Sequence, residues 1–152
     1  MKVKVKELAT KLLPQIHQMG DLQKKGLMGL SQKATYAVAK NFNNALDLIK
    51  PYEKHRQDLI SKHVQINEHK KPLTEQAENG QVDYVFISED DKNAFIKEIE
   101  AALEQEVEFT PYKFSQEELE ACHNIPVDAL AVLMDMQIIT EINLAHGLHT
   151  VK

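Results

Sequence analysis

The stretch that decides the fold is SQKATYAVAKNFNNALDLIKPYEKHRQDLISKHVQI, residues 31–66. Apolar residues recur in it three and four positions apart, which is the spacing of one face of an α-helix. The apolar stripe keeps its phase across Pro51, so the sequence predicts one continuous helix that is kinked there. A straight helix over this stretch would be roughly 50 Å long, because each residue adds about 1.5 Å. It needs packing partners along its length, either other helices or a second copy of the chain.

The elements expected on either side of this helix are short. Ser88 and Ser115 are each followed three residues later by an acidic residue, a pattern that caps the N-terminus of a helix. The expected elements are a strand or helix start over residues 1–6, a helix over 7–19 that Pro14 kinks or ends, a strand over 82–87, a helix over 89–104, a strand over 106–114, and helices that begin at Ser115 and near Pro126. The predicted fold class is therefore α+β and predominantly α, a long helical hairpin with a small two- or three-stranded sheet.

A chain of 152 residues has the usual length of one domain. Residues 67–81 are polar and contain the turn-forming pair Asn79–Gly80, which predicts a mobile loop or insert. Within a single domain spanning 1–152 we expect a helical half over 1–66, the insert over 67–81, a β-α-β-α part over 82–139 and a tail over 140–152.

Charge and composition argue against several classes of partner. The net charge is −5 and Arg56 is the only arginine, whereas nucleic-acid binding depends on a basic, usually arginine-rich surface. No apolar run approaches the ~18 residues that span a bilayer, so we expect no membrane association. The single cysteine, Cys122, excludes an intramolecular disulfide, and a cytoplasmic, reducing compartment is expected.

Recognisable catalytic motifs do not emerge from the sequence. The glycines form no phosphate-binding loop. Cys122 is followed by His123, but neighbouring glutamates oppose thiolate formation. His146 and His149 have a spacing that can place two metal ligands on one helical face, without a second ligand cluster. The carboxylates of residues 88–108 fit a solvated acidic face. We therefore expect no catalytic residue, no cofactor and no metal.

Two groups of residues are candidates for binding. The expected interaction surface follows the long helix, and the expected anion-binding group consists of lysines near its start. The first group is Tyr36, Phe42, Ile49, Tyr52, Arg56 and Leu59, and the second is Lys24, Lys25, Lys33 and Lys40.

Three stretches carry a resemblance to a known family. They are YAVAKNFNNALDLIKPYEKHRQDLI (residues 36–60), DDKNAFIKEIEAALEQEVEF (90–109) and IPVDALAVLMDM (125–136). Their order and pattern resemble a family of small uncharacterised phage and prophage proteins over about residues 30–138. The resemblance implies a phage context, and hence the cytoplasm of a host cell, but it implies no activity and no site residue.

The leading functional prediction is a phage-type accessory protein that acts without catalysis, by binding a phage or host protein, and that forms a homo-oligomer. One alternative is an anti-defence protein that inhibits a host immune factor or sequesters a small nucleotide signal. Another is a hydrolase with an unrecognised site. A nucleotide site should be lined by Lys, Tyr and backbone amides, an assembly surface should expose apolar side chains, and an enzyme should gather carboxylates or histidines in a cleft.

Overall fold

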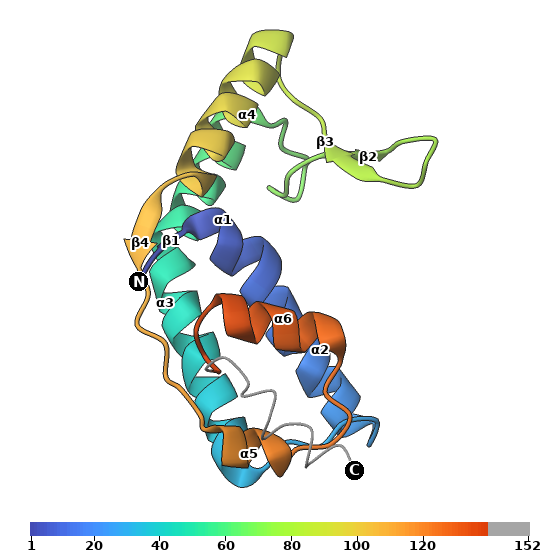
Figure 1. The fold of residues 1–152 in the computed structure, drawn as a ribbon. Coiled ribbons are helices and arrows are strands. Elements are labelled where there is room, and N and C mark those ends of the chain that lie inside the picture. Colours follow the sequence, from blue (N-terminus) through green and yellow to red (C-terminus); the bar gives the residue numbers. More distant parts are fainter. Residues whose placement is uncertain (140–152) are drawn as a thin grey trace. The chain divides into compact units, whose positions relative to one another are not determined.

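The computed structural model describes residues 1–139 and is drawn in Figure 1. The elements in chain order are β1 (Lys2–Lys4), α1 (Val5–Glu7), the π-helical segment η1 (Leu8–Leu12), α2 (Leu13–Lys24), α3 (Gln32–His63), β2 (Thr74–Gln76), β3 (Val82–Tyr84), α4 (Glu89–Leu103), β4 (Glu106–Glu108), α5 (Gln116–Glu120) and α6 (Val127–Asp135). The predicted α+β, predominantly α class is confirmed, with β1–β4 and β2–β3 forming two small antiparallel sheets.

The chain divides into two compact units. The first comprises Met1–Leu48 and the chain from Glu106 onwards, and the second comprises Ile49–Gln105. The prediction of one folding domain stays a prediction, because two such units can unfold either together or separately. None of the helices within residues 1–139 is both long and apolar enough to cross a membrane.

Helix α3 is the long helix that the sequence predicts, and it continues through Pro51 without a break. It begins after Ser31, whose Oγ accepts a hydrogen bond from the backbone N–H of Ala34 at 3.2 Å. This bond satisfies one of the N–H groups that have no partner within the first helical turn. The helix ends at His63, three residues before the expected end at Ile66.

The N-terminal residues form both of the expected alternatives in succession. Strand β1 pairs with β4 in an antiparallel register that places Val3 opposite Val107, and helix α1 follows at once. Pro14 does not end the helical run, which continues to Lys24. Pro14 lies in the first turn of α2, where a missing N–H costs no helical hydrogen bond, and it directly follows the wider π-helical turn of η1.

The core of the first unit is built by helices from both ends of the chain. Helix α6 contacts η1 and α2, and its Ala129 and Leu133 are buried together with Leu8 and Leu12 of η1. An extended segment between β4 and α5 runs along α3 in Figure 1 and buries Phe109 and Phe114 completely or nearly so. This segment carries part of the candidate site described below.

The second unit has a small apolar core between α3 and α4. Leu59, Ile60 and Val64 at the end of α3 pack with Phe95 of α4, and Tyr84 and Phe86 are partly buried against them. The two aromatic residues enter the core from β3 and the residues just after it. The hairpin β2–β3 is thus attached to the core by its second strand.

Residues 67–81, expected as a loop or insert, contain a strand. They contain β2, and a closed set of three backbone hydrogen bonds fixes the base of the hairpin: Gln65 N–H to Val85 O (2.8 Å), Val85 N–H to Leu73 O (2.9 Å) and Leu73 N–H to Gln65 O (2.7 Å). Asn67 Oδ1 accepts bonds from the backbone N–H groups of His69 and Lys71, which closes a tight turn. The polar composition here reflects a solvated hairpin and its turns.

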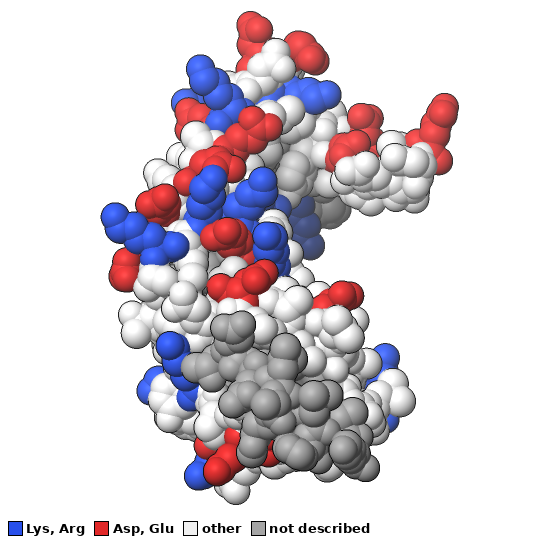
Figure 2. Space-filling model, viewed as in Figure 1, with Lys and Arg blue, Asp and Glu red and all other residues white. Residues whose placement is uncertain are grey.

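The acidic residues of α4 lie among basic ones. Figure 2 shows Lys and Arg side chains interspersed with Asp and Glu over the visible face of the second unit. Glu98 of α4 is paired with His55 of α3, with His55 Nε2 and Glu98 Oε2 3.5 Å apart. Glu98, within the acidic stretch of residues 88–108, therefore has a basic neighbour within the same unit.

A polar network joins the end of α3 to the start of α4. His63 is buried, and its Nδ1 lies 2.7 Å from Asp91 Oδ1. Ser88 caps α4 and donates from Oγ to Asp91 Oδ2 at 2.6 Å. The hydrogen bonds from Ser88 and then His63 hold the pKa of Asp91 below its ordinary value of 3.8, because they stabilise the carboxylate.

The burial of Ile49 leads to a first prediction. Its side chain is 7% exposed, so Ile49→Asp should lower the free energy of unfolding by about 3 kcal/mol or more, since a buried carboxylate would have no partner. The matched control is Ile96→Asp on α4, where the native side chain is 41% exposed and the cost should be below about 1 kcal/mol. Urea unfolding followed by circular dichroism measures both. Equal stability of the two variants would contradict the assignment of Ile49 to the interior.

The network around Asp91 leads to a second prediction. Because its pKa is lowered in the folded chain, Asp91 contributes stability that is complete above the unfolded pKa and is lost as pH falls through the lower folded pKa. Asp91→Asn should therefore destabilise the chain at pH 6 and have a much smaller effect near pH 3. Asp90→Asn, in the same first turn of α4, controls for the helix dipole. A pH-independent difference between wild type and Asp91→Asn would refute this role.

Candidate functional site

Two exposed tyrosines and three lysines lie together on the first unit. We call Tyr36, Lys40, Tyr112, Lys33 and Lys113 the tyrosine–lysine surface. The rings of Tyr36 and Tyr112 pack edge to face, with centroids 5.4 Å apart and planes at 75°. Lys40 Nζ lies 5.0 Å from the centre of the Tyr112 ring and 5.9 Å from that of Tyr36. A cation over aromatic faces at this distance is an attractive contact, and it fixes all three side chains relative to one another.

A buried asparagine positions this surface. Asn41 on α3 is fully buried, and its Nδ2 donates to the backbone oxygens of Ala37 and Tyr112, each at 2.7 Å. Its Oδ1 accepts from the backbone N–H of Tyr112 at 2.9 Å. One side chain thus satisfies both backbone groups of Tyr112, which holds the extended segment against α3 and places the Tyr112 ring beside Tyr36.

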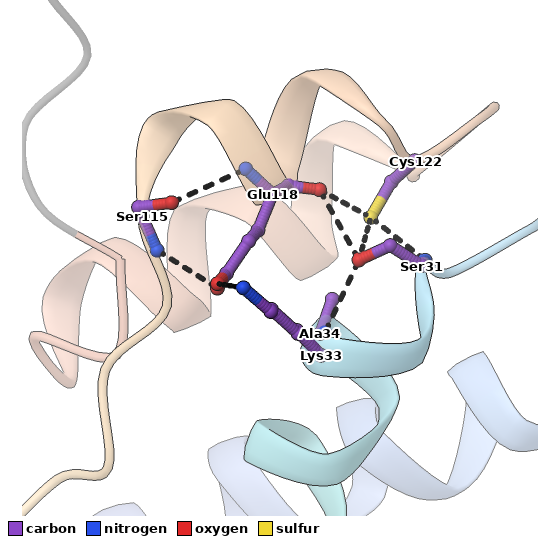
Figure 3. A network of polar contacts seen from close by, with 6 residues as sticks. All are labelled: Ser31, Lys33, Ala34, Ser115, Glu118 and Cys122. Atoms are coloured by element: carbon purple, nitrogen blue, oxygen red, sulfur yellow. Dashed lines mark hydrogen bonds and ion pairs between the residues drawn. The ribbon is translucent and has the colours of Figure 1, made fainter.

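A second polar network fixes the start of α3 beside α5, and Figure 3 shows it from close by. Ser115 and Glu118 form the expected capping box of α5. Glu118 also pairs with Lys33 of α3, with Nζ and Oε1 3.8 Å apart, and its backbone oxygen accepts bonds from Ser31 Oγ and Cys122 Sγ. Glu118 therefore holds Lys33 at the edge of the tyrosine–lysine surface.

A groove of about 550 Å³ opens along this surface. It is lined by Gln32, Lys33, Tyr36, Tyr112, Lys113 and Glu118. Its volume lies within the range of small-molecule sites, roughly 300–1,000 Å³. Glu118 is the only acidic residue that lines it, and neither Lys40 nor Lys113 is paired with a carboxylate of residues 1–139. The groove and its border therefore carry an excess of positive charge.

The structure divides the predicted lysines into two pairs. Lys33 and Lys40 belong to the tyrosine–lysine surface with Tyr36. Lys24 instead lines a separate, mainly apolar groove of about 300 Å³ between α2 and α3, together with Phe42, which is half-buried. Lys25 is the exposed C-cap residue of α2. The expected anion-binding group is thus not one cluster.

The remaining predicted residues lie in the second unit. Ile49 and Leu59 are buried packing positions and are not available to a partner. Arg56 donates to the Tyr84 hydroxyl at 2.9 Å. Tyr52 lines a groove of about 380 Å³ that also contains His55 and Glu98. Burial raises the pKa of Tyr52, so its phenol stays protonated at neutral pH.

The groove beside Tyr52 is the arrangement closest to an enzyme site. It brings one histidine and one carboxylate to 3.5 Å, but no Ser, Thr, Cys or Lys of residues 1–139 lines it. Cys122 is half-buried and its thiol bridges Ser31 and Glu118, which makes it part of the network at the start of α3. Among residues 1–139 no three potential ligands come together to hold a metal ion, and His146 and His149 lie outside the described residues.

No family model, curated protein or solved structure matches the chain. The resemblance to phage and prophage proteins therefore stays a prediction. Only the geometry of the described residues bears on the function.

Sequence reasoning missed Asn41, Tyr112 and Lys113 as site residues. Asn41 had a usable signal, because it occupies a position in the buried phase of α3, between Ala37 and Ala45, where an apolar residue is expected. The alternation over 106–114 left open whether Tyr112 or Phe114 points inward. Phe114 is 3% exposed and Tyr112 is 41% exposed, so the inward position belongs to Phe114.

The role of Asn41 gives a third prediction. Asn41→Leu should remove the partners of both backbone groups of Tyr112 and destabilise the first unit by about 1–3 kcal/mol. Amide hydrogen exchange of peptides that cover residues 109–115 should become faster than in wild type. Asn43→Leu, at an exposed position of α3, should leave that exchange unchanged. Equal exchange in Asn41→Leu and wild type would show that Asn41 does not position Tyr112.

Proposed function

We propose that the chain works without catalysis, as a binding protein whose working surface is the tyrosine–lysine surface. The observation that carries the proposal is the pair of exposed tyrosines, Tyr36 and Tyr112, which are 57% and 41% exposed and share one lysine. The backbone of Tyr112 is held by the fully buried Asn41. Burying side chains this large against a partner is favourable, because it removes apolar area from water. Fixing them in place beforehand lowers the entropy lost on binding.

The partner that fits this surface is a protein segment with acidic and apolar side chains. Tyrosine is enriched at protein interfaces, where its ring supplies area and its hydroxyl supplies a hydrogen bond. Lys33, Lys40 and Lys113 favour an acidic segment and would speed its approach. The resemblance to phage proteins directs the search for this segment to phage and host proteins, and a second copy of this chain is the homo-oligomeric alternative.

The proposal can be tested without knowing the partner. A displayed library of random 12-residue peptides is selected on the immobilised chain, and we expect enrichment of Asp and Glu together with aromatic or apolar residues. The double variant Tyr36→Ala, Tyr112→Ala should bind the selected peptides at least about 30-fold more weakly, as expected for residues that each contribute strongly to an interface. Lys25→Ala, at an exposed lysine that does not line the groove, should bind them normally.

Selected peptides that bind the double variant as tightly as wild type would refute this surface. Sedimentation equilibrium of the purified chain decides between the two kinds of protein partner. A mass that stays at 17.3 kDa over a wide concentration range would exclude a second copy.

A further inference from the structure

The groove of the tyrosine–lysine surface gathers three kinds of group in one place. Its lysines offer positive charge, its tyrosines offer aromatic rings, and the Gln32 amide offers a hydrogen-bond donor and an acceptor. A ligand that satisfies all three kinds of group must combine a planar ring, hydrogen-bonding edges and a strong negative charge. These three requirements together restrict the class of possible ligands more than the requirement for negative charge alone.

We propose that the groove binds a nucleoside phosphate, with the base stacked on a tyrosine ring and the phosphates held by lysines. This inference rests on the proposed function, because it assigns a small ligand to the same working surface. It adds a chemical class of ligand, and it implies that the nucleotide and the acidic protein segment exclude each other.

The rings can take a base without rearrangement. An edge-to-face pair at a 75° angle leaves ring surface open, and Tyr36 keeps more than half of its surface exposed. Tyr36 lines the groove itself, so a base that enters the groove meets this ring. Stacking of a base on an aromatic side chain is favourable for every base, because each base has a π face. The Gln32 amide adds a donor and an acceptor for the edge of the base.

The lysines provide for the phosphates. Lys33 comes from the first turns of α3 and Lys113 from the extended segment before α5, and both line the groove. Lys40 adds a third positive charge beside the rings. Glu118 supplies an opposing negative charge. Its carboxylate is paired with Lys33 and accepts a hydrogen bond from the backbone N–H of Ser115 at 3.1 Å. The net positive charge favours a polyphosphate over a neutral aromatic ligand.

The groove volume fits a nucleotide better than it fits a nucleic-acid strand. At about 550 Å³ the groove has room for one drug-sized ligand. A strand of several nucleotides needs a longer basic track, and the chain as a whole is acidic with a net charge of −5. A single nucleoside phosphate uses the local positive charge without requiring a basic protein.

The test compares three probes by isothermal titration calorimetry: ATP, adenosine and inorganic tripolyphosphate. ATP should bind at least tenfold more tightly than either part, because only ATP supplies both ring and phosphates. Tyr36→Ala should weaken ATP binding roughly tenfold or more, the usual effect of removing a stacking ring, and leave tripolyphosphate binding unchanged. Lys113→Ala should weaken ATP and tripolyphosphate alike, and Lys25→Ala should weaken neither. Added salt should weaken ATP binding in wild type.

Other results would contradict the binding of a nucleoside phosphate in this groove. Equal affinities for ATP and tripolyphosphate would overturn it in favour of a site for polyanions. ATP binding that does not displace a selected acidic peptide would also overturn it, because the ligands would then use different surfaces. If the peptide binds and depends on Tyr36 and Tyr112 while ATP does not bind, the nucleotide is excluded and the proposed function stands. If neither binds, the proposed function fails as well.

Discussion

The structure depends on the need to cover the apolar stripe of α3. A helix of 32 residues presents more apolar surface than one short helix can bury, so different segments cover its two parts. In the first unit the cover comes from elements that are distant in sequence, and in the second it comes from α4 and the residues after β3. Asn41 lies within the buried phase of the stripe and is the point at which the covering segment is fixed by hydrogen bonds. The position of Tyr112 in the tyrosine–lysine surface follows from these hydrogen bonds.

Local chemistry explains which elements could be predicted from the sequence. The caps at Ser88 and Ser115 need only residues three positions away, and both were predicted at the right place. The pairing of Lys2–Lys4 with Glu106–Glu108 joins segments that are far apart in the sequence, and no local pattern specifies such a partner. Strand β2 was missed because it is polar and short, whereas β3 falls within the strand predicted over 82–87. Pro14 was expected to kink or end its helix, and the helical run does not end there because a π-helical turn precedes the proline, which the sequence did not reveal.

The residues of the candidate site also fall into two groups: those that lie close together in the sequence, and those that only the fold brings to the same surface. Lys33, Tyr36 and Lys40 follow one another at three- and four-residue spacing on α3, so their shared face was visible in the sequence. Tyr112 and Lys113 reach that face only through the bonds to Asn41, which link positions separated by 71 residues. The sequence therefore indicated Lys33, Tyr36 and Lys40 of this surface but not Tyr112 and Lys113. The sequence also assigned Ile49 and Leu59 to an interaction surface because they lie on the apolar stripe of α3. The fold buries that stripe.

The two buried polar side chains among residues 1–139 are Asn41 and His63, and they differ in how their polar atoms are hydrogen-bonded. Asn41 has partners for both of its polar atoms and cannot titrate, so the geometry of the tyrosine–lysine surface does not depend on the protonation of the group that holds it. His63 uses Nδ1 to reach Asp91, while its buried Nε2 has no partner. An imidazole with its only proton on Nε2 would direct the Nδ1 lone pair at a carboxylate oxygen 2.7 Å away, which is repulsive, so the proton must lie on Nδ1. Asn41 thus holds the binding surface through both polar atoms of an amide that carries no charge, whereas His63 holds the junction of α3 with α4 through its bond to Asp91.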